Sequence, residues 1–311
     1  MRRDLLQKLS HFILYYKMKC EKLCIFIGDF RLFALHRIRR PHALVYPNGV
    51  LLSIVIITHN EEANIARTLN SVAPLVRDGA GEIIVVDSGS TDGTIKIAKS
   101  FGAKVFQEDW KGFAAQKNSA IDKASGDWVL SLDADEELSP EAQRFVTALL
   151  LRPAAEQPGG VLFGRRNYFL GRWIRHGGFY PDKKLRLFRK GNGHFEDRLV
   201  HEDVALTPGL WIEDPGGIDL IHHAYPTLAG YIEHMNRYSS LGAQMASGKG
   251  SNSGPWGIVA RPIATFLYNY FLRLGFLDGH EGLLLHLSHA GYVFWKYAKI
   301  WELRETGQSP P

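Results

Sequence analysis

The stretch Asp127-Trp128-Val129-Leu130-Ser131-Leu132-Asp133-Ala134-Asp135-Glu136-Glu137 decides the fold of this chain, because an apolar run ends in it abruptly at two aspartates. Such a run is typical of a buried strand. Side chains two residues apart in an extended chain point the same way, so we expect Asp133 and Asp135 to face one point at the carboxyl end of the strand. Open α/β sheets bind ligands at that edge. Two carboxylates with open coordination positions suit Mg²⁺ or Mn²⁺ held jointly with a phosphate.

The same stretch also allows a simpler interpretation, in which it only begins the next helix. Ser139 is an expected N-cap, Pro140 fits the first turn, and carboxylates are favoured at that end of a helix. Three glutamates need no other role: Glu136, Glu137 and Glu141. For Asp133 and Asp135 we favour the metal interpretation, because the strand before them supplies the geometry.

Length and composition indicate one large α/β domain with extensions. The 311 residues are 45% hydrophobic and 22% charged, as in folded rather than disordered proteins. Cys20 and Cys24 are the two cysteines, so no disulfide framework is predicted. Their spacing places them on one face of a helix, where small buried side chains are commoner than a four-ligand metal site. A reducing, cytoplasmic compartment is therefore expected.

Positive charge is concentrated in two regions. Residues 1–50 hold ten Lys/Arg against three Asp/Glu, a net of +7, and residues 161–201 have the same balance. Such regions suit anionic membranes or phosphorylated substrates, and Arg165 and Arg166 are hypothesised to bind an anionic acceptor. Nucleic-acid binding is not expected, because the basic regions lack a recognisable motif.

Neither a secretory signal nor a membrane-spanning helix is expected. Three lysines interrupt the early apolar residues, namely Lys17, Lys19 and Lys22. The longest late uncharged run, from Gly282 to Trp295, is shorter than the about 20 residues that a spanning helix needs.

The chain divides into three predicted parts. Residues 1–50 form a basic amphipathic extension, which either lies on an anionic membrane surface or packs on the protein itself. Residues 51–226 alternate strands and helices, which predicts a Rossmann-like α/β domain whose mostly parallel sheet has helices on both faces. Residues 227–311 form a helical region with the aromatic and basic residues typical of membrane interfaces, interrupted by a loop at 247–257.

Two other strands end in polar loops. The strand 53–58 leads into Thr58-His59-Asn60-Glu61, and the strand 82–86 into Asp87-Ser88-Gly89-Ser90-Thr91-Asp92-Gly93. Asp87 is a candidate to accept hydrogen bonds from a base or ribose, and the residues from Ser88 onward offer backbone N–H groups. Alternatively, Ser90 and Asp92-Gly93 are ordinary turn and cap residues. Convergence of these loops with the two aspartates predicts a ligand site.

These motifs resemble those of a known family. S-I-V-I-I-T-H-N-E-E, I-I-V-V-D-S-G-S-T-D-G-T, Q-K-N and L-D-A-D-E occur in order within residues 52–150, as in the nucleotide-sugar domain of family 2 glycosyltransferases. The segment 180–188, with Val200-His201-Glu202, is similar to the β-1,4-glucosyltransferases that extend the inner core of bacterial lipopolysaccharide. The fifty-residue basic leader departs from that pattern.

The resemblance implies a GT-A fold and a metal-dependent, inverting hexosyltransferase that uses Mg²⁺ or Mn²⁺ and a UDP-sugar. Lys117 is implied to lie near the nucleotide, Asp133 to contact ribose or metal, and Asp135 to bind the metal. Further residues are implied to hold the uridine: Thr58, Asn60, Glu61, Asp87 and the adjoining Ser88.

Four further residues are weaker candidates. We favour Glu202 as the catalytic base with Asp203 in reserve, although both also fit a surface acidic pair. His222 either completes the metal site or is a buried core histidine. Arg186 is expected to face the diphosphate or the acceptor, mainly because of the motif match.

The expected activity is transfer of glucose from a UDP-sugar to a hydroxyl of an anionic glycolipid, such as lipopolysaccharide core. The protein would then lie peripherally on the inner face of the cytoplasmic membrane. Alternatives are transfer to a polyprenyl phosphate or a protein, and a non-catalytic, membrane-associated nucleotide-sugar binding protein. A receiver-like signalling module is disfavoured, since it needs an acidic pair after the first strand.

Overall fold

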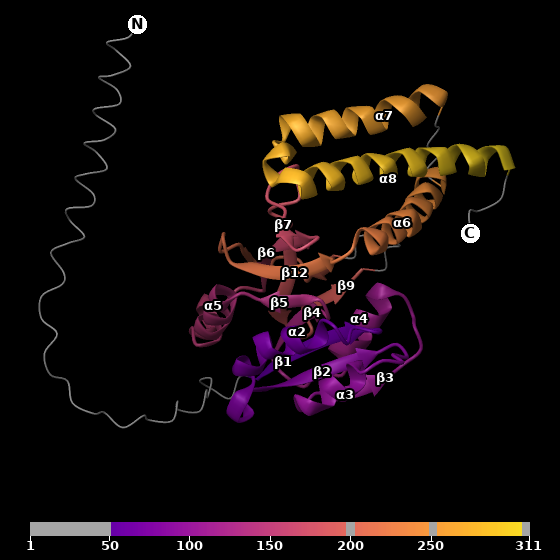
Figure 1. Ribbon diagram of the computed structural model, residues 1–311. Helices are drawn as coiled ribbons and strands as arrows, with labels where there is room; N and C mark the ends of the chain where they lie inside the picture. The colour runs from indigo at the N-terminus through magenta and orange to yellow at the C-terminus, as the bar shows by residue number, and fades with distance from the viewer. Residues whose placement is uncertain (1–50, 197–202, 249–253, 307–311) are drawn as a thin grey trace, which may run out of the picture. The chain divides into compact units, whose positions relative to one another are not determined.

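The computed structural model describes residues 51–196, 203–248 and 254–306 (Figure 1). The chain divides into two compact units, Met1–His42 and Ala43–Pro311, and every feature below belongs to the second. The expectations for the leader at residues 1–50, including Cys20 and Cys24, and for Glu202 lie outside the described residues.

The first half of the sheet is parallel. It contains β1 (Leu52–Thr58), β2 (Gly81–Asp87), β3 (Lys104–Gln107) and β4 (Trp128–Asp133), in the order β3-β2-β1-β4. The register pairs Thr58 with Asp87 and Ile57 with Asp133. The three polar strand ends therefore meet at one edge of the sheet, as predicted from the sequence.

Helices cover both faces of this half, because consecutive residues of the strands are apolar and point to opposite faces. Ile54 and Ile56 of β1 belong to one buried cluster with residues of α2 (Ile65–Val72) and α5 (Pro140–Leu150), whereas Val55 and Ile57 belong to another with residues of α4 (Phe113–Asp122). The helices are α2 (Ile65–Val72), α3 (Thr94–Ser100), α4 (Phe113–Asp122) and α5 (Pro140–Leu150), with short turns η2 (Ala73–Leu75), η3 (Arg77–Gly79) and η4 (Ala154–Glu156). The predicted start of α5 is confirmed, since Ser139 Oγ accepts from Ala142 N at 3.1 Å.

The second half of the sheet is mixed. β8 (Lys184–Arg189) pairs antiparallel with both β4 and β6 (Gly160–Phe169), since no helix lies between β6 and β8 to return the chain in parallel. β12 (Asp219–Tyr225) runs parallel to β6 and antiparallel to β5 (Glu136–Leu138). β7 (Arg172–Trp173) and β11 (Ile212–Glu213) also pair with β6, and β9 (Gly193–Phe195) forms a separate hairpin with β10 (Val204–Leu206).

The C-terminal region is helical, as expected. α6 (Leu228–Gly248) and α7 (Pro255–Leu267) both pack against α8 (Gly279–Thr306), with η5 (Tyr268–Leu272) and η6 (Gly275–Asp278) between α7 and α8 (Figure 1). A loop was expected at 247–257, but α6 continues to Gly248 and α7 begins at Pro255, so both helices extend into that range. A third apolar cluster joins the helices to β6 through Phe169, Ile174, Tyr231 and Leu285. Within the described residues, no helix is long and apolar enough to cross a bilayer.

Candidate active site

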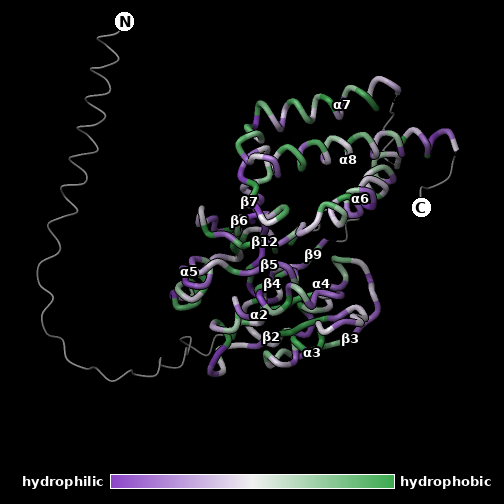
Figure 2. Tube along the Cα trace, in the orientation of Figure 1, coloured by the Kyte–Doolittle hydropathy of each residue, from purple (hydrophilic) through white to green (hydrophobic). Residues whose placement is uncertain are grey.

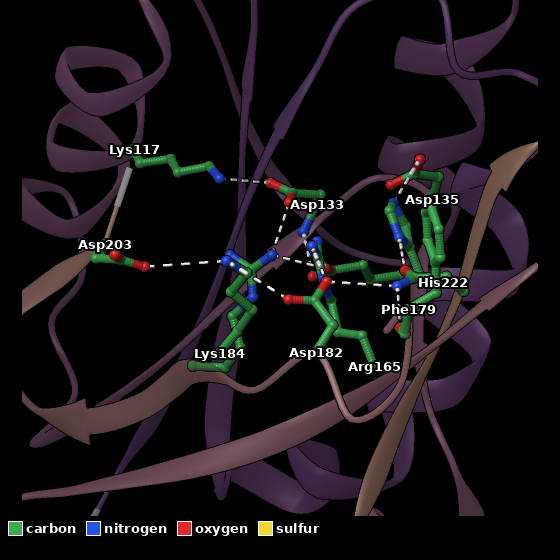
Figure 3. Close-up of polar contacts among 12 residues, drawn as sticks. Lys117, Asp133, Asp135, Arg165, Phe179, Asp182, Lys184, Asp203 and His222 are labelled. Carbon is green, nitrogen blue, oxygen red and sulfur yellow. Dashed lines mark hydrogen bonds and ion pairs between the residues drawn. The ribbon is translucent and has the colours of Figure 1, made fainter. Parts of the chain in front are cut away.

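The acidic stretch turns at the sheet edge instead of continuing as a strand. β4 ends at Asp133, a turn follows at Ala134 and Asp135, and β5 starts at Glu136. The prediction that Asp133 and Asp135 lie on one face of an extended strand is therefore wrong. They remain neighbours at the carboxyl edge, but their carboxylates have different partners (Figure 3).

Asp133 is neutralised by cations of the protein. Its Oδ1 lies 2.8 Å from Lys117 Nζ, and its Oδ2 lies 2.7 Å from Arg186 Nη2. Burial alone would raise the pKa of Asp133, but Arg186 and Lys117 outweigh it and hold the pKa well below its usual range. Asp133 is therefore ionised in the folded protein at neutral pH.

Arg186 lies inside the protein and not at the open side of the site. The residue is almost fully buried, and its Nη2 also lies 2.6 Å from Oε1 of Glu136. The structure thus gives no support to direct contact between Arg186 and a diphosphate or acceptor. Its position explains instead how two carboxylates, Asp133 and Glu136, are held at the end of β4.

Glu136 is a site-forming residue that the sequence did not reveal. Its side chain is fully buried, and Oε1 also receives Arg165 Nη1 at 3.1 Å. Arg165 Nε in turn donates to Asp182 Oδ2 at 2.9 Å. Arg165 is therefore already paired, and Arg166 is paired with Asp219 at 2.8 Å, so neither is a free acceptor-binding cation.

Asp135 faces a histidine whose orientation is fixed. Its Oδ2 lies 3.3 Å from Nε2 of His222, and Nδ1 of His222 lies 2.7 Å from Oδ1 of Asn167. The amide of Asn167 cannot be reversed without loss, because its Nδ2 donates to Phe179 O at 3.2 Å and to Asp182 Oδ2 at 3.4 Å. Nδ1 of His222 must then carry a hydrogen, which leaves Nε2 to face Asp135 (Figure 3).

This arrangement fits a divalent cation. An imidazole whose Nδ1–H is engaged by the protein, so that Nε2 can act as a ligand, is the usual form of a metal-binding histidine. Among the described residues no three acidic, histidine or cysteine side chains form a ready-made metal cage. Asp135 and His222 would therefore supply two ligands, and the remaining positions would fall to a ligand such as a diphosphate, and to water.

A further carboxyl adds negative charge at this point. Burial raises the pKa of Glu61, and repulsion from Asp135, Asp92 and Asp133 adds to it, although a hydrogen bond from Asn64 opposes the rise. Because Asp133 already has two cations, the unbalanced negative charge lies near Asp135 and Glu61. A bound cation would reduce that repulsion.

The two polar loops hold each other in place. Both oxygens of the buried Asp87 are used within its own loop, where Oδ1 accepts from Gly89 N at 3.0 Å and Ser90 N at 2.9 Å. Asn60 has a positive φ of 54°, and its Oδ1 accepts from Thr91 N at 2.8 Å. Asp87 thus shapes its own loop through these hydrogen bonds.

Two smaller groups complete the edge. Ser88 N donates to Thr58 O at 3.0 Å, which joins the ends of β1 and β2. The buried Oγ1 of Thr58 has no hydrogen-bond partner within the described residues.

The strand that leads toward the predicted base is attached to α4. Asn118 Nδ2 donates to Phe195 O at 2.9 Å, and Phe195 N donates to Asn118 Oδ1 at 2.8 Å. Glu196 N then donates to Asp203 O at 3.2 Å, so the residues that flank segment 197–202 lie opposite each other. The exposed Asp203 is near the site, with Oδ1 3.9 Å from Lys184 Nζ (Figure 3).

The parallel sheet, the acidic turn at its carboxyl edge and the mixed extension beyond β4 are the arrangement of a GT-A glycosyltransferase domain. The model of glycosyl transferase family 2 matches residues 53–203. An uncharacterized glycosyltransferase of Rickettsia typhi is 31% identical over 81% of this chain and 87% of that protein. The lipopolysaccharide core biosynthesis glycosyltransferase LpsC of Rhizobium meliloti is 29% identical over 81% of this chain and 92% of that protein. The chain belongs to glycosyltransferase family 2.

Solved structures with similar folds include two nucleotide complexes. The mannosyltransferase PcManGT from Pyrobaculum calidifontis, in complex with GDP-Man and Mn²⁺, is 17% identical and matches 96% of this chain and 97% of that chain with a TM-score of 0.49. TarS 1-349 of S. aureus, in complex with UDP, is 18% identical and matches 83% of this chain and 92% of that chain with a TM-score of 0.43.

Replacing Arg186 tests whether the buried ion network supports the site. Arg186→Met leaves the fully buried Glu136 with Arg165 alone, so we expect the free energy of unfolding to fall by about 3–5 kcal/mol. Adding Glu136→Gln should recover part of the loss. Urea unfolding measures both changes.

The matched control is Arg144→Met, which removes an exposed ion pair with Glu141. The free energy of unfolding should change by no more than about 0.5 kcal/mol. An Arg186→Met protein as stable as this control would show that the network does not hold the site together.

The Asp135–His222 pair predicts a pH dependence of stability in a chelator. Burial alone would lower the pKa of His222 and raise that of Asp135. The charge of the partner outweighs burial in both cases, so the pKa of His222 is raised and that of Asp135 is lowered. The pair then stabilises the fold fully between about pH 4 and 6.5, the unfolded-state values. Its contribution is lost as pH falls through the lowered pKa of Asp135 or rises through the raised pKa of His222.

We therefore expect the difference in Tm between wild type and His222→Gln to be largest in that window and to shrink above about pH 6.5. Thermal unfolding over a pH series measures it. In the His222→Gln background, Asp135→Asn should raise the Tm above about pH 4, because it removes a buried carboxylate that has lost its partner. A constant difference across the series would mean that the pair does not form.

Proposed function

We propose that this protein transfers glucose from UDP-glucose to a hydroxyl of an anionic glycolipid of the lipopolysaccharide-core type, with inversion at the anomeric carbon. Membership of family 2 supports sugar transfer, and the 29% identity with LpsC over most of both chains supports a core-type acceptor. The resemblance of residues 180–188 to β-1,4-glucosyltransferases supports glucose. Peripheral residence on the inner face of the cytoplasmic membrane would give access to both substrates.

The proposal rests mainly on the different partners of the two aspartates in the acidic turn. Asp133 is held by Lys117 and Arg186, so it is an ionised acceptor for the hydroxyls of the donor's ribose. Asp135 and the oriented His222 are left to hold Mg²⁺ or Mn²⁺ together with the diphosphate. When bound, the cation supplies neutralisation of the charge that develops on the departing diphosphate.

The other residues of the site would bind the uridine of the donor and accept the proton of the acceptor hydroxyl. The loops that contain Thr58, Asn60, Glu61 and Asp87-Ser88 would form the walls around the uridine. The acceptor hydroxyl attacks the anomeric carbon, the bond from that carbon to the diphosphate breaks, and Glu202 accepts the hydroxyl proton. General-base help of this kind contributes roughly 10²–10⁴ in rate. The position of Asp203, one residue later and near Lys184, supports this role for Glu202.

The direct test is release of UDP from UDP-glucose in the presence of purified inner-core lipopolysaccharide. We expect release with Mn²⁺ or Mg²⁺, loss of it in a chelator, and recovery when the metal is restored. GDP-glucose and ADP-glucose serve as controls for the nucleotide, and neither should support transfer. Transfer that proceeds equally well in the chelator would contradict the proposed role of the metal.

The Glu202→Gln variant separates the proposal from its main rival. A hydroxyl acceptor needs a base, so this variant should lose on the order of 100-fold in kcat, whereas a polyprenyl phosphate acceptor is already ionised and needs none. Asp203→Asn is the matched comparison. Unchanged turnover in Glu202→Gln would favour a phosphate acceptor. Loss of turnover in Asp203→Asn alone would indicate that Asp203 is the base.

A further inference from the structure

A continuous apolar surface runs along α7 and into η5 and η6. Trp256, Val259, Ile263 and Leu267 recur at intervals of three and four residues, so they lie on one face of α7, opposite the side that packs on α8. Trp256 is 86% exposed, and Leu272 of η5 is 75% exposed. We call the following exposed residues the apolar stripe: Trp256, Val259, Ile263, Leu267, Phe271, Leu272, Leu274, Phe276 and Leu277.

An apolar surface of this extent marks an interaction site, since soluble monomers rarely expose contiguous patches of large apolar side chains. Figure 2 shows the same concentration of hydrophobic residues along α7. Helix α7 does not span a bilayer, as no described helix does, so the stripe is suited to lying on a surface and not to crossing one.

The charge around the stripe selects its partner. Residues 254–277 contain two arginines and no aspartate or glutamate. The Arg261 guanidinium lies 4.1 Å from the centre of the Tyr297 ring, and that of Arg273 lies 5.8 Å from the centre of the Tyr268 ring. Aromatic side chains with arginines beside an apolar helix face are the composition of segments that bind anionic membrane surfaces.

A partner within the chain itself fits less well. The leader, residues 1–50, carries a net charge of +7 and would bring like charge against Arg261 and Arg273. We propose that the apolar stripe docks this protein on an anionic lipid bilayer, with the stripe inserted among the headgroups and Arg273, at its η5 end, near the phosphates.

The stripe is joined directly to the segment that orients His222 in the candidate active site. Asp278, at the end of η6, accepts from Arg175 N at 3.1 Å and from His176 N at 2.8 Å, and Gly177 N donates to Arg273 O at 2.8 Å. Two residues further along this segment, the carbonyl of Phe179 accepts from the Asn167 amide that orients His222. Docking would therefore fix the distance between the site and the bilayer. That this helps the site to reach its acceptor rests on the proposed function, in which the acceptor is a glycolipid.

The experiment measures vesicle binding by the full chain without donor or acceptor, so its result is independent of catalysis. Vesicles of phosphatidylcholine, with or without phosphatidylglycerol, are sedimented with wild type, with Trp256→Ser/Leu272→Ser, and with Trp110→Ser/Trp211→Ser. The last pair is the matched control, because both tryptophans are 51% exposed and lie outside the stripe. We expect wild type and control to bind phosphatidylglycerol vesicles alike, and the stripe variant to bind at least tenfold more weakly.

Tryptophan quenching by brominated lipid separates the stripe from the leader, which contains no tryptophan. Quenching should be strong in wild type and should largely disappear in Trp256→Phe. Binding that persists in the stripe variant, or binding without quenching of Trp256, would overturn the proposal. A dimer in solution that the stripe variant alone fails to form would overturn it too, by assigning the stripe to a second copy. A protein that binds vesicles but turns over no donor would contradict only the proposed function.

Discussion

The structure of the site depends on one buried guanidinium. Arg186, on β8, contacts Asp133 at the end of β4 and Glu136 at the start of β5, so it fixes the turn between two strands of the sheet. Without it, the half-buried carboxylate of Asp133 and the fully buried carboxylate of Glu136 would repel each other. Arg165 extends the network to Asp182, which also accepts a weak hydrogen bond from Asn167. The orientation of His222 is thereby linked to the same ion pairs.

This network gives the two aspartates different surroundings. Asp133 has its charge balanced by Lys117 and Arg186, whereas Asp135 faces only an imidazole that can exchange its proton for a metal ion. The excess negative charge near Asp135 and Glu61 would favour the proposed cation there, while Asp133 keeps its two protein cations. The segment 175–179, whose Phe179 carbonyl holds Asn167 in place, is hydrogen-bonded to Arg273 and Asp278 beside the apolar stripe, so the proposed metal site and the proposed membrane surface are connected.

Local sequence patterns predicted the features that depend on local physics. The buried strands before Thr58, Asp87 and Asp133, and the N-cap at Ser139, were correct because periodicity and capping are properties of short segments. The turn at Ala134 was missed, since an acidic end of a strand looks alike whether it stays extended or bends. Glu136 was taken for a helix-end acid because its partners, Arg165 and Arg186, lie 29 and 50 residues away. Asn167 carries no motif at all, and only the folded chain brings it to His222.

The most direct test of this account is the binding of Mn²⁺ measured by electron paramagnetic resonance, with and without UDP. Wild type should bind Mn²⁺ weakly alone and much more tightly with UDP. Asp135→Asn should lose at least about tenfold in affinity, by analogy with the losses seen when metal-site partners are removed. Glu137→Gln is the matched control, because Glu137, two residues later in β5, forms a second acid–histidine pair with His223 of β12 at 3.0 Å. Equal Mn²⁺ affinity in wild type and Asp135→Asn, with UDP present, would contradict the account.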